Sequence, residues 1–320
     1  MSFKFSAQPH PVQRFKQQDV SFVNDFVAVE EPLEIRLRFF DSGDWQEKSL
    51  SITMRTPGND TELALGFLFT EGILQPGETL DNIVESAADN SILIVFPQSK
   101  SLDWQKLQRH FYTTSSCGVC GKSSIDSVKT SCNVFNPLEP VSPPESTDAE
   151  SIRITINKDN QTWTPEQLYV LDEIVQQHQE QFGLTGGIHA CALFANAYKP
   201  NTRNAADISP QAEAHTPSLI AIREDVGRHN ALDKLVGCML QQQQIPATQQ
   251  LLWLSGRCSF EMVQKAAMAG IRCIASVGAP TSLAIELAEE LGITLIGFLR
   301  QQRFNIYSHP HRIISPQHWF

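Results

Sequence analysis

Hydrophobic and polar residues along the first third of the chain follow a pattern that predicts strands around one helix. Leu33–Phe40 alternates apolar and charged residues, as a half-buried strand does, and Ser49–Met54 and Ile92–Phe96 predict two more strands. Thr56–Asp60 has the composition of a turn that ends in an N-cap residue, so we expect a helix from about Thr61 to Leu74. This part of the chain therefore predicts a small α+β domain.

The second half alternates strands and helices more regularly, after a helix expected from Pro165 to about Phe182. A strand followed by a helix recurs three times, which implies right-handed crossovers and a largely parallel sheet. The expected strands are His189–Phe194, Ser218–Arg223, Gln250–Leu254, Arg272–Val277 and Thr294–Leu299, and the expected helices are Asn230–Gln242, Phe260–Ala269 and Ser282–Leu291.

A proline-rich stretch separates these two regions. Four prolines between residues 136 and 151 exclude a helix or a central strand there, and we interpret this stretch as a linker. The expected domains are therefore residues 1–135 and residues 152–320. The polar, alanine-rich stretch Asn196–Pro217 predicts a mobile insertion, to which the sequence assigns no role.

Composition narrows the class of protein. The chain has 320 residues, of which 41% are hydrophobic and 19% charged, so a globular core is expected. A formal net charge of −10 argues against general binding to nucleic acid or to an anionic membrane, so an anionic ligand needs local cations or backbone N–H groups. The chain starts without an apolar run of signal-peptide length, and its seven cysteines are scattered. These features predict a cytoplasmic protein with reduced thiols.

A pair of cysteines is the most reactive feature of the sequence. Two residues separate Cys117 from Cys120, and Gly118 and Gly121 allow tight turns and the close approach of a partner. If Lys122 begins a helix, both thiols lie at its positive end, which favours the thiolate. Such a thiolate can attack a persulfide donor and carry the terminal sulfur, while the second cysteine could release or protect the first.

The spacing of this pair leaves two other interpretations open. A four-ligand zinc site needs a second pair at similar spacing, whereas Cys132 and Cys191 stand alone, so we expect no bound metal. A thioredoxin-like redox pair is expected directly after a strand of a βαβ unit, whereas this pair follows serine and threonine residues in a predicted loop.

Three glycine-containing turns follow expected strands of the second half, namely Glu224–His229, Ser255–Cys258 and Gly278–Ser282. Ligands of open α/β sheets bind at this edge, where helix N-termini offer N–H groups to phosphates and Arg228 and Arg257 could add full charges. Each turn alone is more typical of ordinary helix capping than of a ligand site. Together they favour a nucleotide-like ligand.

These features in order resemble the FdhD family, the accessory sulfurtransferases required for formate dehydrogenase activity. The stretches that carry the resemblance are Gly66–Gly72 (GFLFTEG), Cys117–Gly121 (CGVCG), Gly186–Ala192 (GGIHACA), Glu224–Leu235 (EDVGRHNALDKL), Glu261–Met268 (EMVQKAAM) and Phe298–Arg312 (FLRQQRFNIYSHPHR).

The resemblance implies a cytidine-deaminase-like three-layer fold for the C-terminal domain. It implies that a cysteine desulfurase supplies sulfur, that the substrate is the Mo-bis-molybdopterin guanine dinucleotide cofactor, and that formate dehydrogenase receives the sulfurated product. It also allows a homodimer that holds one guanine dinucleotide arm in each subunit. By position, Cys117 matches the persulfide cysteine with Cys120 in support. The segment that matches the cofactor-binding residues is Phe298, Leu299, Arg300, Gln301, Gln302 and Arg303.

Three rival functions remain to be weighed. Deaminase activity is rejected, because the H-x-E sequence His178–Glu180 follows the cysteine pair and lies in an expected helix. A molybdenum-cofactor chaperone would bind the cofactor without donating sulfur, and a dithiol oxidoreductase would cycle Cys117 and Cys120 through a disulfide. The Cys117 thiol distinguishes a sulfur carrier from the chaperone.

Overall fold

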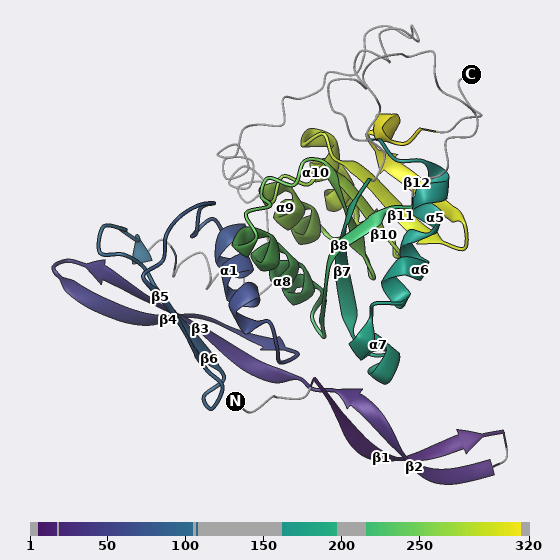
Figure 1. The fold of residues 1–320 in the computed structure, drawn as a ribbon, viewed down its shortest axis with the longest axis horizontal. Helices are drawn as coiled ribbons and strands as arrows, with labels where there is room; N and C mark the ends of the chain where they lie inside the picture. The colour runs from purple at the N-terminus through teal and green to yellow at the C-terminus, as the bar shows by residue number, and fades with distance from the viewer. Residues whose placement is uncertain (1–5, 18, 105–106, 108–161, 197–215, 315–320) are drawn as a thin grey trace, which may run out of the picture. The chain divides into compact units, whose positions relative to one another are not determined.

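A computed structural model describes residues 6–17, 19–104, 107, 162–196 and 216–314, which form a mixed α/β structure (Figure 1). The chain divides into two compact units. The first contains β1–β6, α1, α7 and α8 together with His189 and Glu224–Asp225, and the second contains the rest of a six-stranded sheet with α5, α6, α9 and α10. Cys117, Cys120 and the expected linker lie outside the described residues.

A four-stranded sheet with the order β4-β3-β6-β5 forms the first unit, and it includes all three strands expected in that part of the sequence. Leu33, Ile35, Leu37 and Phe39 are buried at alternate positions of β3, which confirms that one face of this strand meets a core. β3 pairs antiparallel with β4 and parallel with β6, and β5 pairs antiparallel with β6. The bounds are β3 Glu31–Asp41, β4 Asp44–Arg55, β5 Asn82–Ser86 and β6 Ser91–Val95.

Two helices of the first unit, α1 (Asp60–Thr70) and α8 (Arg228–Gln241), pack against each other. Helix α1 ends earlier than expected because Gly72, at φ 74°, turns the chain into a left-handed conformation. The N–H of Ile73 then donates to the carbonyl of Leu68 at 2.8 Å, which satisfies one of the last helical carbonyls. The glycine after the helix therefore sets its end.

A ribbon of two antiparallel strands, β1 (Ala7–Lys16) and β2 (Asp19–Ala28), precedes this sheet and was not expected from the sequence. The short helix α7 (Glu180–Thr185) packs on both strands. The carboxylate of Glu224 accepts the N–H groups of Gln181 and Phe182 at 3.1 and 3.0 Å and so caps this helix. Burial raises the pKa of Glu224, although these two hydrogen bonds act in the opposite direction.

The six-stranded sheet of the second unit has the order β12-β11-β10-β9-β7-β8. The expected strand and helix alternation is confirmed, but the sheet is mixed rather than largely parallel. β9, β10 and β11 are parallel, whereas β7 is antiparallel to β9, and β12 returns antiparallel to β11 through a tight turn. The bounds are β7 His189–Ala195, β8 Ser218–Asp225, β9 Gln250–Leu254, β10 Cys273–Ser276, β11 Thr294–Arg300 and β12 Arg303–Ser308, and the crossover helices are α9 Phe260–Met268 and α10 Ser282–Glu290.

The single helix expected from Pro165 to Phe182 is wrong, because the chain forms three short helices there. Helix α5 (Pro165–Tyr169) begins at a capping box made by Thr164 and Gln167, and α6 (Leu171–Gln176) follows it. Nδ1 of His178 lies 2.8 Å from the carbonyl oxygen of Ile174, where a continuing helix would place a backbone N–H. α7 is therefore a separate helix.

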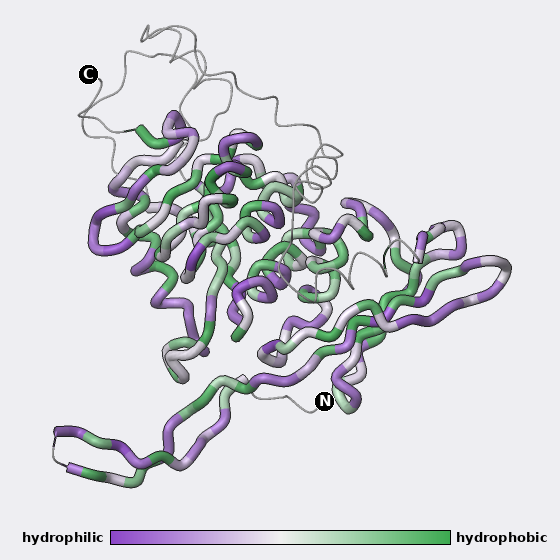
Figure 2. The backbone as a smooth tube through the Cα atoms, turned by 180° about the vertical axis from the view of Figure 1, so that it is seen from behind, coloured by the Kyte–Doolittle hydropathy of each residue, from purple (hydrophilic) through white to green (hydrophobic). Residues whose placement is uncertain are grey.

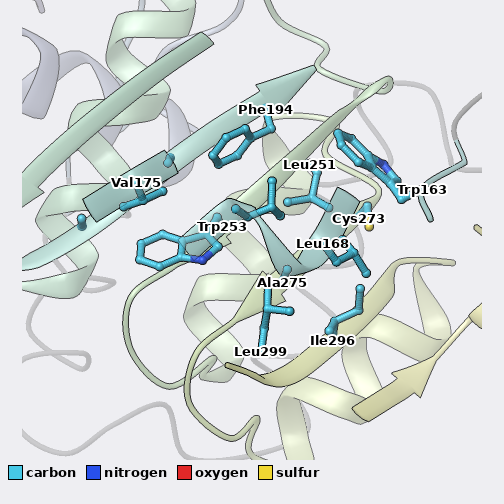
Figure 3. Close-up of a cluster of buried hydrophobic side chains, with 13 residues drawn as sticks. Trp163, Leu168, Val175, Phe194, Leu251, Trp253, Cys273, Ala275, Ile296 and Leu299 are labelled. Atoms are coloured by element: carbon cyan, nitrogen blue, oxygen red, sulfur yellow. The ribbon is translucent and has the colours of Figure 1, made fainter. Parts of the chain in front are cut away.

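Large apolar side chains from strands and helices form the core of the second unit (Figure 3). Trp163 and Trp253 lie in this cluster with Phe194 and Ile296, and all four are at most 2% exposed. Leu168 of α5 and Val175 of α6 join it, so both short helices are anchored by buried leucine or valine. In the part of the chain that the structure describes, no helix is long and apolar enough to cross a membrane.

Candidate functional site

The four described cysteines are buried, and none of them forms a disulfide. Burial raises the pKa of the Cys258 and Cys273 thiols to about 12, so both remain protonated at neutral pH. The other two are Cys191 and Cys238. The remaining cysteines of the chain, Cys117 and Cys120 among them, lie outside the described residues.

The expected cofactor-binding segment Phe298–Arg303 forms the end of the β11–β12 hairpin. Gln301 and Gln302 are the two residues of the turn, and both have positive φ values of 52° and 55°, as a type I′ turn requires. Arg300 and Arg303 pair across the strands directly beside the turn, and all four of these side chains are exposed. Leu299 is only 1% exposed, so its side chain belongs to the core cluster.

Phe298 interrupts the regular pairing of this hairpin and ties it to a neighbouring turn. Its φ is 56°, and the pairing register shifts between Gly297 and Arg300. The N–H of Phe298 donates to the carbonyl of Gly278 at 3.1 Å, and the N–H of Gly278 donates to the carbonyl of Gly256 at 3.2 Å. The ends of three neighbouring parallel strands are thereby linked by backbone hydrogen bonds.

Two of the three turns singled out in the sequence thus lie together at this edge of the sheet. The N–H of Cys258 donates to Ala279 at 3.3 Å, and Thr281 donates back to Cys258 at 3.0 Å. A Cβ atom on Gly278 would come within 2.9 Å of the backbone nitrogen of Arg257, so this turn requires glycine. The third turn, Glu224–His229, belongs to the first unit.

A pocket of about 220 Å³ lies beside the hairpin in the second unit. Its carboxylates come from α6, where burial raises the pKa of half-buried Asp172 despite a hydrogen bond from Gln176. The carboxylates of Asp172 and Glu173 and the guanidinium of Arg300 line the pocket. With two acceptor groups and one cation, the pocket suits a ligand that donates hydrogen bonds better than it suits a phosphate. The sequence did not indicate this half of the pocket, because its residues fall within the single helix expected from Pro165 to about Phe182. The lining residues are Tyr169, Asp172, Glu173, Gln176, Leu299, Arg300, Gln301 and Gln302.

The motif Glu224–Leu235 forms a buried polar network in the first unit. The carboxylate of Asp225 lies 2.7 Å from Nζ of Lys234 and accepts the N–H of Thr56 at 3.1 Å. Asn230 donates from Nδ2 to the carbonyl of Met54 at 2.7 Å. These motif residues connect the start of α8 to the segment between β4 and α1, which is a structural role.

The pKa of His189, in the same unit, is shifted from its ordinary value. Burial lowers the pKa of His189, and electrostatic interactions with Arg228 and His229 lower it further, while Asp225 acts in the opposite direction. The imidazole is therefore neutral at pH 7. The sequence placed His189 beside Cys191 on one strand, and it missed the grouping with Arg228 because the two residues are far apart in the chain.

Comparison with known proteins gives a consistent result. The FdhD/NarQ family matches residues 28–209 and 211–314. The chain is 41% identical over 310 residues to the sulfur carrier protein FdhD of Streptomyces avermitilis, with 94% of each chain covered. It is 35% identical to the protein of that name from Sulfurisphaera tokodaii, with 95% of this chain and 97% of the relative covered.

A solved structure extends the likeness to the fold. The crystal structure of a protein described as a formate dehydrogenase accessory protein from Desulfotalea psychrophila matches with a TM-score of 0.64 and 21% identity. The match covers 96% of this chain and 99% of that one. The mixed α/β fold is thus shared over nearly the whole length, and with the family match and the identities above, the chain belongs to the FdhD/NarQ family.

Proposed function

We propose that the protein is a sulfur carrier that takes persulfide sulfur from a cysteine desulfurase onto Cys117. It then transfers this sulfur to the Mo-bis-molybdopterin guanine dinucleotide cofactor of a formate dehydrogenase. The observation that carries the proposal is the match of nearly the whole chain to proteins named sulfur carrier protein FdhD, together with the motif Cys117–Gly121. The burial of the four described thiols supports it, because they cannot compete for sulfur.

The first step is an exchange at sulfur. The Cys117 thiolate attacks the terminal sulfur of the desulfurase persulfide, and a new S–S bond forms on Cys117. The S–S bond of the donor breaks, and its cysteine leaves as a thiolate, so no external oxidant or reductant is consumed. Cys120, three positions further along the chain, could release or protect the sulfur on Cys117.

Intact-protein and peptide mass spectrometry tests the sulfur-carrier assignment. After incubation with a cysteine desulfurase and cysteine, we expect the mass of one added sulfur atom on the peptide that contains Cys117, and its loss in Cys117→Ala. Cys258→Ala is the matched control, because a buried thiol with a raised pKa should not accept sulfur. If Cys117→Ala gains sulfur as fully as the wild type does, the carrier cysteine is a different residue.

The hairpin Phe298–Arg303 is proposed to bind the guanine dinucleotide end of the cofactor. Phe298, Gln301 and Gln302 all have positive φ values, and such conformations cost about 1 kcal/mol or more each in residues other than glycine. Arg300 and Arg303 are directly opposite, where two like charges repel. An anion between the two guanidinium groups would relieve that repulsion, and each group can bind a phosphate with two hydrogen bonds.

Calorimetry with GDP, as a surrogate for one arm of the cofactor, tests this assignment. We expect Arg300→Ala and Arg303→Ala each to weaken binding by about 1.5–3 kcal/mol, a tenfold loss or more, because each removes a charge-assisted contact. Arg36→Ala is the control, since Arg36 is a half-exposed arginine of the first unit paired with Glu47. Equal affinities in wild type and both hairpin variants would place the guanine site elsewhere.

A cofactor chaperone is the second candidate, since the features of the hairpin do not depend on sulfur chemistry. The variant Cys117→Ala distinguishes the two functions. It should retain GDP binding whether the protein is a chaperone or a sulfur carrier. A chaperone would still restore formate dehydrogenase activity with Cys117→Ala, whereas a sulfur carrier would not.

A further inference from the structure

The pocket beside the β11–β12 hairpin combines hydrogen-bond acceptors with apolar and aromatic surface. Asp172 and Glu173 of α6 supply carboxylates, and Leu299, which is only 1% exposed, supplies apolar surface at the end of β11. Tyr169 adds an aromatic ring whose centroid lies 5.8 Å from that of Phe304 on β12. Figure 2 shows the hairpin turn as a hydrophilic loop that follows the hydrophobic strand β11. This lining suits a flat ring with a polar edge.

Asp172 is the half-buried carboxylate of the pocket, whereas Glu173 is exposed. Burial raises the pKa of Asp172, because its charged form has lost part of its hydration. Nε2 of Gln176 donates to Oδ2 of Asp172 at 3.1 Å, and among the described residues no other group donates to this carboxylate. A carboxylate has about four lone-pair sites, so the donors of a ligand can occupy the remaining ones.

The cation and the anions of the pocket do not neutralise each other. Arg300 lines the pocket together with the two carboxylates, yet within the part of the chain that the structure describes it forms no ion pair with either of them. The amides of Gln301 and Gln302 are further donors on the hairpin side. A ligand that fills the pocket therefore needs donors toward Asp172 and an acceptor toward the hairpin.

The volume of the pocket limits the size of its ligand. About 220 Å³ is less than the roughly 300–1,000 Å³ of a site for a drug-sized molecule, so one ring system fits and a whole nucleotide does not. The rest of the ligand must leave past Arg300, which lines the pocket and pairs with Arg303 across the two strands. A ring joined to a phosphate chain has this shape.

We propose that this pocket takes the guanine base of the cofactor and that Asp172 determines its specificity for guanine. This inference rests on the proposed binding of the guanine dinucleotide end at the hairpin. Guanine has two adjacent donors, N1–H and the N2 amino group, which match the two oxygens of one carboxylate in a charge-assisted bidentate pair. Its O6 can accept from a glutamine amide of the turn. Adenine presents an acceptor nitrogen beside its amino group, and a carboxylate repels that nitrogen.

The pterin ring of the cofactor carries the same pair of donors beside a carbonyl group. The chemistry that Asp172 recognises is therefore shared by two rings of one ligand. The volume of the pocket favours guanine, because the pterin of the cofactor is fused to a third ring and is the larger of the two. A free pterin is accordingly one of the probes in the test.

Calorimetry of the full chain with GDP, inosine diphosphate and ADP tests the assignment. Inosine diphosphate lacks the N2 amino group, so the wild type should bind GDP on the order of tenfold more tightly than either other nucleotide. In Asp172→Asn the preference for GDP over inosine diphosphate should disappear, because the amide offers a donor where the carboxylate offers an acceptor. Inorganic pyrophosphate probes the hairpin arginines alone, and Asp172→Asn should bind it no more weakly than the wild type does.

Glu166→Gln is the matched control, because Glu166 is an exposed carboxylate of α5 that does not line the pocket. This variant should bind all three nucleotides as the wild type does. A loss of the GDP preference in Glu166→Gln would show that general charge near the hairpin, and not one carboxylate, sets the preference.

Each remaining outcome separates this inference from the proposal on which it rests. An unchanged preference for GDP in Asp172→Asn overturns the inference alone, if Arg300→Ala and Arg303→Ala still lose pyrophosphate binding. A preference that disappears only in Glu173→Gln assigns the reading of the base to the exposed carboxylate. If 6-hydroxymethylpterin binds the wild type but not Asp172→Asn, while GDP binds both equally, the pocket belongs to the pterin. A wild type that binds neither GDP nor pyrophosphate contradicts the hairpin proposal as well.

Discussion

Replacing Gly66 with alanine is expected to destabilise the protein by about 3 kcal/mol or more, the upper end of what overpacking costs. Gly66 lies on α1 where it crosses α8, and a Cβ atom there would overlap the backbone carbonyl of Asp233. Gly237 on α8 is equally close to α1, since a Cβ atom on Gly237 would overlap the backbone carbonyl of Glu62. Backbone atoms cannot rotate away as a side chain can, so the two helices must separate.

Urea unfolding followed by circular dichroism measures this effect. Gly183→Ala is the matched control, because Gly183 is also helical but a Cβ atom there would have no neighbour within 4 Å. That substitution should be neutral or should stabilise the protein by about 0.5–1 kcal/mol, as alanine favours a helix over glycine. Equal unfolding free energies for Gly66→Ala and Gly183→Ala would contradict the close approach of α1 and α8.

Replacing Lys234 with methionine should destabilise the protein by about 3–5 kcal/mol, since it leaves a buried carboxylate without its cation. Lys234 and Asp225 are 2% and 0% exposed, and their charged atoms are 2.7 Å apart. Nζ of Lys234 also donates to the carbonyl of Thr56 at 2.8 Å, so the substitution removes a second buried hydrogen bond. A loss of this size is a large part of the stability of an ordinary domain.

Urea unfolding also measures the effect of Lys234→Met against that of breaking an exposed ion pair. Glu47→Gln breaks the ion pair of Glu47 with Arg36, whose side chains are 36% and 41% exposed, and should cost less than about 1 kcal/mol. The double variant Lys234→Met with Asp225→Asn should recover part of the loss, because it leaves no unpaired buried charge and keeps an oxygen that can accept from Gly227 and Asn230. A change below about 1 kcal/mol in Lys234→Met would show that water reaches this pair.

Helices and strands could be predicted from the sequence wherever hydrophobic residues recur with a clear helical or strand periodicity. β3 and the crossover helices α8, α9 and α10 lie within a few residues of their expected bounds. The long helix expected after Pro165 is wrong. The glutamine-rich sequence continues a helical pattern through Gln177–Gln179, but His178 ends one helix and Glu224 caps the start of the next. The start of α7 depends on Glu224, which is more than 40 residues away in the chain and accepts the N–H groups of Gln181 and Phe182.

The candidate site was also predicted only in part from the sequence. The residues of Phe298–Arg303 could be named from the sequence because they form one continuous stretch that resembles a family motif. Their hairpin with three positive φ values, and the pocket that Tyr169 and Asp172 complete, could not be named, because both depend on how β11 pairs with β12 and where α5 and α6 pack. Cys117 and Cys120 remain a prediction of the sequence alone.

By itself, the sequence determined the family and most strands and helices of the two units, and it named candidate reactive residues, because local periodicity and motif spacing record which residues are buried or special. Only the tertiary structure decided that β7 lies between β9 and β8 and runs antiparallel to β9, that Gly66 meets α8, and that Phe15 and Phe22 of the β1–β2 ribbon are exposed. Periodicity shows that a face is apolar but not what covers it, since the partner is selected by packing between distant segments.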